Sequence, residues 1–199
     1  MNYAALNAKL RAMSAKTPSP QASKVVYLAA INICRYIPDK PLKDFIVEAA
    51  RFATGDVNIH CYTTQWKRLN RLDKPNRVAL RSIQGAEIDL NNILWMYRLK
   101  RYHRVTGDGT YGYLVPIRYR LCRETTRRMA DCVTPKALLD EVLNSPYATD
   151  FNMLIKEGFD RTSAQTPEQM LANAICRRYQ AAARRYPNSL APALAYLRR

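Results

Sequence analysis

Histidine and paired cysteines are scarce in this sequence. It has two histidines, His60 and His103, and none of its five cysteines forms a Cys-x-x-Cys pair. Zinc sites and disulfide frameworks depend on such spacings, so we expect neither a metal site nor a disulfide scaffold. Phosphate-loop, nucleophile-elbow and zinc signatures are also missing. The sequence therefore predicts no catalytic residues, no cofactor and no small-molecule substrate.

Long apolar runs are missing as well. No stretch approaches the roughly 18 apolar residues of a membrane-spanning helix, and no apolar signal region opens the chain. We therefore expect a cytoplasmic protein that is neither exported nor membrane-spanning. Glycine (6) and proline (11) are too few for a fibrous or linker protein. The 48% of hydrophobic residues favour a packed globule.

Acidic residues are half as numerous as basic ones. Sixteen Asp plus Glu stand against 32 Lys plus Arg, which gives a formal net charge of +16, and arginine outnumbers lysine by 22 to 10. Net charge governs association rather than fold. The charge predicts an acidic partner, and nucleic acid, an anionic membrane surface and an acidic protein patch all fit.

Helical periodicity runs through the chain, and no stretch alternates long enough to predict a strand. We therefore predict an all-α, multi-helix bundle. We expect the chain to comprise an N-terminal helix over 1–15, a proline-containing linker over 16–21 and a single helical domain over 22–199. Within that domain we expect helical segments over 22–37, 39–54, 57–69, 77–83, 87–103, 118–132, 135–144 and 167–185, a break near Pro75, and a last helix after Ser189.

Capping residues mark several helix ends. Thr134 precedes Pro135, which favours a helix start there, and Thr166 to Gln169 spells a capping box with proline at the first helical position. Asn188 and Ser189 can cap the last helix.

One glycine motif, Gly107 to Gly112, spells G-x-G-x-x-G. A dinucleotide-binding loop must follow a strand and open a long helix, whereas this motif follows a helical pattern and leads to Pro116. We interpret it as a flexible loop between helices.

Two basic runs leave nucleic-acid binding open as an alternative function. The first, 97–104, interleaves aromatic and cationic residues. On a helical wheel, however, Trp95 and Tyr102 fall on the apolar arc, with Arg98 and Arg101 opposite. The wheel thus predicts that the aromatics are core and the arginines face water. The second run comprises Arg118, Arg120, Arg123, Arg127 and Arg128.

A polar residue, Asn92, falls inside the same apolar arc. A buried amide needs partners, so we favour a helix-to-helix hydrogen bond that fixes packing and keep a ligand contact as the alternative.

The central string EIDLNNILWMYRLKRYH, followed by YGYLVPIRYRL, resembles a known family. It is similar to the V-type ATPase subunit called C in bacterial and archaeal enzymes and d in eukaryotic vacuolar ones. LLDEVLNSPYATDF and NSLAPALAYLRR extend the resemblance, which is best over 59–199. The matching positions offered as motif or partner-contact residues are Asp89, Asn92, Arg98, Lys100, Tyr113 and Pro116.

The resemblance implies a funnel-like, all-α and noncatalytic subunit. It would lie on the cytoplasmic, inner face of the cell membrane as a peripheral protein, between the central stalk and the membrane rotor ring. There it would couple stalk rotation to proton or sodium transport, with stalk and ring subunits as its partners. The alternative remains a basic helical nucleic-acid-binding protein.

Overall fold

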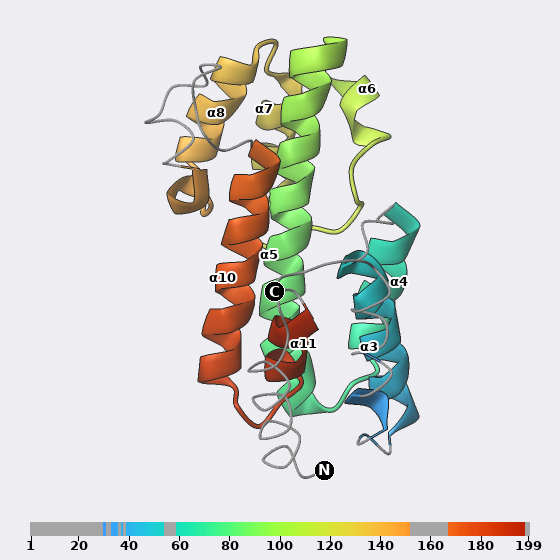
Figure 1. Ribbon diagram of the computed structural model, residues 1–199. Coiled ribbons are helices and arrows are strands. Elements are labelled where there is room, and N and C mark those ends of the chain that lie inside the picture. Colours follow the sequence, from blue (N-terminus) through green and yellow to red (C-terminus); the bar gives the residue numbers. More distant parts are fainter. Residues whose placement is uncertain are drawn as a thin grey trace. The chain divides into compact units, whose positions relative to one another are not determined.

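A computed structural model of the protein describes residues 30, 33–35, 37, 39–53, 59–151 and 167–197. Over these residues the regular structure is helical and contains no strand, which confirms the all-α prediction (Figure 1). No helix in these ranges is long and apolar enough to cross a membrane. The predicted helix over 1–15 and linker over 16–21 lie outside the described residues. The helices are α3 (Lys40–Ala53), α4 (Ile59–Leu69), α5 (Lys74–Arg98), the π-helix η1 (Leu99–His103), α6 (Asp108–Tyr111), α7 (Arg123–Asp131), α8 (Pro135–Leu143), α10 (Pro167–Arg185) and α11 (Ala191–Leu197).

The chain forms two compact units. Unit 1 comprises Met1–Gln84 and Cys176–Arg199, and unit 2 comprises Gly85–Ile175. The boundary therefore falls inside α5 and again inside α10. The single helical domain expected over 22–199 stays a prediction.

In unit 1, α3 packs against α4 and α11. The amphipathic pattern of α3 buries Phe45 and Ile46 completely, and Leu69 at the end of α4 is also fully buried. Asn76 joins the two sequence segments of this unit, because its side-chain oxygen accepts a hydrogen bond from the Leu190 backbone N–H at 2.7 Å. Apolar packing and the hydrogen bond of the buried Asn76 amide thus hold the two sequence segments of unit 1 together.

The break expected near Pro75 is confirmed, although it precedes that proline. α4 ends at Leu69 and α5 begins at Lys74, so Pro75 lies in the first turn, where its missing N–H costs nothing. From there α5 continues to Arg98 without interruption. The separate helical segments expected over 77–83 and 87–103 are therefore wrong in one respect: Gln84 to Ala86 are helical and join them.

The predicted caps in the described ranges are confirmed. The Thr134 hydroxyl accepts a hydrogen bond from the Ala137 N–H at 3.2 Å, with Pro135 at the first helical position. The Ser189 hydroxyl accepts one from the Ala191 N–H at 3.1 Å, at the start of α11. Thr166 lies outside the described residues, and α10 begins at Pro167.

The Gly107 to Gly112 motif is more ordered than the flexible loop expected. It holds the one-turn helix α6, and Gly107 adopts φ 57° while its N–H donates to the Ala130 carbonyl at 3.0 Å. No strand precedes it, since it follows η1.

The helical wheel placed two aromatics wrongly. Trp95 is 40% exposed and Tyr102 is 66% exposed, although both were expected in the core. From Ile83 to Lys100 the helix is buried on most of its circumference, and the stripe left open runs through Trp95 and the half-buried Arg98, which the wheel had placed on opposite sides. η1 adds to the error at Tyr102, because a π-turn holds more residues than an α-turn.

Candidate functional site: a strap anchored on helix α5

Residues 113–121 of unit 2 form a non-helical segment between α6 and α7, which we call the strap (Figure 1). Leu114, Val115 and Leu121 of the strap are buried. Three residues of α5, at i, i+4 and i+7 and therefore on one face of the helix, hold it in place. They are Gly85, Asp89 and Asn92.

Asp89 binds the C-terminal half of the strap. Its carboxylate accepts hydrogen bonds from the backbone N–H groups of Tyr119 (3.3 Å), Arg120 (2.7 Å) and Leu121 (3.1 Å). The Tyr147 hydroxyl donates a fourth at 2.8 Å. Asp89 is only 1% exposed, so these donors replace the water that an isolated carboxylate would lose on burial.

Because these backbone N–H groups bind Asp89, α7 begins later than the sequence predicted. A helix was expected from Arg118, but α7 begins at Arg123. The amides of residues 119–121 converge on a carboxylate of α5, and Cys122 follows with extended dihedral angles of φ −71° and ψ 166°. The Cys122 Sγ lies 3.1 Å from the Thr125 hydroxyl oxygen and caps α7 by accepting from the Thr125 N–H at 3.4 Å. The hydrogen bond to the Thr125 side chain, and then the one from its N–H, lower the pKa of the thiol.

Asn92 binds the middle of the strap through both ends of its amide. The Val115 N–H donates to Asn92 Oδ1 at 2.9 Å, and Asn92 Nδ2 donates to the Val115 carbonyl at 3.0 Å. Asn92 is 5% exposed. This pairing accords with the packing interpretation of Asn92, although the amide bonds to a non-helical segment instead of a second helix.

Gly85 receives the Tyr119 ring. A Cβ atom added at Gly85 would lie 2.2 Å from Cγ of Tyr119, which no real contact allows. Sequence reasoning did not identify this contact. The available signal was a lone glycine inside a helical pattern, which often marks a close approach.

Tyr147 is the second residue that sequence reasoning missed. Its ring is fully buried, and its hydroxyl reaches Asp89 across 58 positions of sequence. The segment around it, LNSPYATDF, contributed to the family resemblance without a role being assigned to any of its residues.

Lys100 is also an interior residue. It belongs to η1, is 3% exposed, and its Nζ donates to the Ala130 carbonyl at 2.8 Å. Loss of hydration lowers the pKa of Lys100, while nearby Cys132 and Asp131 raise it in part. The cation lies at the C-terminal end of α7, where the helix dipole favours positive charge.

The other three candidate residues reach the surface. Tyr113 is 53% exposed and Pro116 is exposed, both on the strap. Arg98 is half-buried, and its guanidinium lies 5.4 Å from the centre of the Trp95 ring. Of the six candidates, then, Asp89, Asn92 and Lys100 make hydrogen bonds in the interior, while Arg98, Tyr113 and Pro116 are open to solvent.

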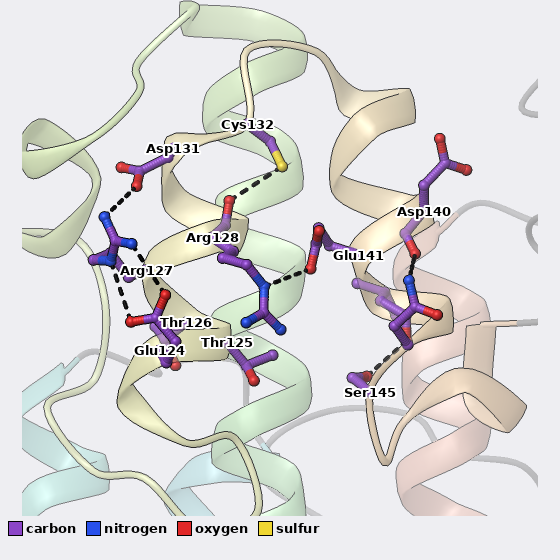
Figure 2. Close-up of polar contacts among 12 residues, drawn as sticks. Glu124, Thr125, Thr126, Arg127, Arg128, Asp131, Cys132, Asp140, Glu141 and Ser145 are labelled. Carbon is purple, nitrogen blue, oxygen red and sulfur yellow. Dashed lines mark hydrogen bonds and ion pairs between the residues drawn. The ribbon is translucent and has the colours of Figure 1, made fainter.

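The second basic run divides into two groups. Arg127 pairs with Glu124 at 3.0 Å and Asp131 at 3.4 Å, and Arg128 of α7 pairs with Glu141 of α8 at 3.1 Å (Figure 2). A hydrogen bond from Arg127 lowers the pKa of Glu124. The second group, whose members are exposed and form no ion pair with any acidic residue in the described ranges, is Arg118, Arg120 and Arg123.

Comparison with protein families supports the resemblance seen in the sequence. The profile of the family described as ATP synthase (C/AC39) subunit matches residues 57–199. The chain belongs to this family. Comparison with curated proteins and with solved structures gives no significant match. All of the strap contacts of this C/AC39 protein lie inside the matched range, as do the six candidate residues. The matched range also agrees with the 59–199 expected from the motif.

Proposed function

We propose that this C/AC39 protein is a noncatalytic central-stalk subunit of a V-type rotary ATPase. It receives the foot of the stalk and couples stalk rotation to the membrane rotor ring, and thereby to proton or sodium transport. The observation that carries the proposal is the family match over residues 57–199. The protein is peripheral to the inner face of the cell membrane in this proposal, with stalk and ring subunits as its partners.

The chemistry of the motif residues supports a mechanical role. Asp89, Asn92 and Lys100 would be plausible reactive or ligand-binding groups at a surface, but each is bound to a backbone group in the interior of unit 2. Together they fasten the strap and α7 to the α5–η1 segment. A part that transmits force must resist internal displacement, and buried, hydrogen-bonded polar groups resist it.

Affinity capture from a cell lysate tests this proposal. The tagged full-length chain is the bait, nuclease is added, and the salt is near physiological, about 150 mM. We expect V-type stalk or ring subunits among the recovered proteins. Recovery of nucleic acid alone, with sub-micromolar binding that persists at this salt, would favour the nucleic-acid alternative instead.

The noncatalytic part of the proposal has its own test. The purified chain should show no ATP hydrolysis above a buffer blank. Turnover that copurifies with the chain and is abolished by a single substitution in it would contradict this part of the proposal.

A further inference from the structure

Three arginines at or just beyond the end of the strap differ from their neighbours: Arg118 and Arg120 belong to the strap, and Arg123 is the first residue of α7. Arg118, Arg120 and Arg123 are exposed and have no acidic partner in the part of the chain that the structure describes, whereas Arg127 and Arg128 of the same basic run are neutralised by acids of α7 and α8. Exposed, uncompensated guanidinium groups attract carboxylates and phosphates, which they bind in a bidentate manner.

The backbone between Arg118 and Arg123 is bound to α5. Asp89 holds the amides of residues 119–121, so the backbone of Arg120 is itself bound at 2.7 Å. Tyr119 is wedged against Gly85, and the Arg120 guanidinium lies 5.7 Å from the centre of the Tyr119 ring. A surface fixed before binding loses less conformational entropy when a partner arrives. The strap is therefore a preorganised cationic surface.

The same strap exposes uncharged groups that a purely ionic ligand would not use. Tyr113 is 53% exposed, and Pro116 is exposed beside buried Val115. Tyrosine and arginine are enriched among the residues that dominate protein–protein binding energy, and lysine is depleted at such interfaces. The strap contains tyrosine and arginine and no lysine.

We propose that the surface formed by Tyr113, Pro116, Arg118, Arg120 and Arg123 is the docking surface for a carboxylate-rich face of a protein partner. The charge of the surface and its exposed tyrosine and proline favour this occupant. The inference deepens the proposed function and rests on it, since the partner would be an acidic face of a V-type subunit. Asp89 is a positioning residue here, because it holds the strap and does not reach the partner.

The test compares two triple variants of the full chain that remove equal charge. The strap variant is Arg118→Gln, Arg120→Gln and Arg123→Gln. The control variant is Arg177→Gln, Arg184→Gln and Arg185→Gln, at three exposed positions of α10. Circular dichroism checks that both stay folded. None of the six side chains is buried, so neither variant should unfold.

Two measurements are made on each variant at about 150 mM salt. The first is capture of V-type subunits from lysate. The second is the dissociation constant of three labelled probes: an oligoglutamate peptide, an oligothymidylate and phosphatidylserine vesicles. We expect the strap variant to lose capture and to bind oligoglutamate about tenfold more weakly, with a change below about threefold in the control. The oligothymidylate and the vesicles should weaken equally for both variants, because net charge governs them.

The outcomes separate this inference from the proposed function. Equal capture and equal oligoglutamate binding by the two variants would overturn the docking surface, even if V-type subunits are recovered. A selective loss for oligothymidylate or for vesicles would overturn it in favour of a phosphate-bearing ligand. If wild type recovers no V-type subunit but oligoglutamate binding still depends on the strap arginines, the docking surface stands and the proposed function fails.

Discussion

Asp89 and Gly85 occupy one face of α5 and contact the strap in opposite ways. The carboxylate of Asp89 attracts three backbone N–H groups and a phenol, whereas Gly85 contributes only the absence of a side chain. Hydrogen bonds to a buried charged group contribute roughly 1.5–3 kcal/mol each. A steric clash in a packed interior costs a similar amount. Each contact can therefore be tested by one substitution, at Tyr147 for the Asp89 carboxylate and at Gly85 itself for the Tyr119 ring.

Tyr147→Phe removes one donor to Asp89 and leaves the ring in place. We expect the free energy of unfolding to fall by about 1–3 kcal/mol, because the carboxylate loses one of its four hydrogen bonds. Urea unfolding measures the change. Tyr113→Phe is the matched control, since Tyr113 is exposed, and it should change stability by less than about 0.5 kcal/mol. Equal effects of the two substitutions would contradict the role assigned to Tyr147.

Gly85→Ala should destabilise the protein, against the usual trend. Alanine normally stabilises a helix interior relative to glycine by about 1 kcal/mol. Here the added Cβ would lie 2.2 Å from the Tyr119 ring, so we expect a net loss of about 1–3 kcal/mol from overpacking. Thermal or urea unfolding measures it. Gly112→Ala, where an added Cβ meets nothing within 4 Å, serves as control, and a stabilised Gly85→Ala protein would show that the ring does not rest there.

At the scale of elements, the strap runs antiparallel to α5. Its early residue Val115 meets Asn92, and its later residue Tyr119 meets Gly85, seven positions earlier in the helix. The N–H groups of Tyr113 and Leu114 donate to carbonyls of α6. For the N–H groups of Val115 and of residues 119–121, side chains of α5 take the place of a neighbouring strand. The strap should therefore detach locally when one of these side chains is removed.

Asn92→Leu tests this local attachment. Leucine has a similar volume but leaves the Val115 N–H and carbonyl without their partner, which costs about 1–3 kcal/mol. We expect faster amide hydrogen exchange at Val115 and its neighbours, with exchange in α3 and α11 unchanged. Unaltered strap exchange together with loss of partner capture would support the ligand-contact alternative for Asn92.

Lys100 links η1 to α7 and makes that link depend on pH. Burial lowers the pKa of Lys100 from its ordinary value of 10.5. Between the lowered folded value and 10.5 the unfolded chain binds more protons, so stability rises with pH in this window. Below the folded value, the penalty for burying the charge is fully present.

The corresponding experiment compares wild type with Lys100→Met. We take the unfolding free energy of wild type minus that of the variant. This difference should increase as the pH rises towards about 10, because only wild type has a buried ammonium whose burial cost disappears when it loses its proton. Urea unfolding at several pH values measures it. Lys136→Met, at an exposed lysine of α8, controls for the loss of a positive charge. If the difference in unfolding free energy decreased as the pH rises, the predicted direction of the pH dependence would be wrong.

At the scale of the whole molecule, the net charge of +16 gives a background attraction to any polyanion. We predict weak binding to single-stranded DNA that collapses between about 50 and 200 mM salt, because such binding depends on counterion release. Fluorescence anisotropy over a salt series checks this. The strap variant and the α10 control variant should follow the same salt dependence. Tight binding that survives at the higher salt would contradict the prediction.

Much of the fold follows from local sequence signals, and much of the site does not. Thr134 and Ser189 could be identified as caps because a cap depends only on its next few residues. The hydrogen bonds of Asp89 could not be predicted in this way, because one of them joins α5 to Tyr147, 58 positions away. Periodicity also misplaced Trp95, because it counts an apolar ring as core, whereas tertiary packing leaves the stripe through Trp95 and Arg98 open to solvent. The family resemblance named six candidate residues, but it did not show that three of them, Asp89, Asn92 and Lys100, face inward.

The π-turn η1 has a consequence for chain length. Leu99 accepts hydrogen bonds from the N–H groups of both Arg104 and Val105, so its carbonyl spans five and six residues where an α-turn spans four. The π-turn thus contains one residue more than an α-turn at the same place would. A relative one residue shorter between positions 99 and 103 could relax to an ordinary α-turn and leave α6 in place, whereas the same loss inside α5 would rotate every later side chain by about 100°. We therefore expect deletion of one residue from this turn to be tolerated better than deletion of one residue from α5.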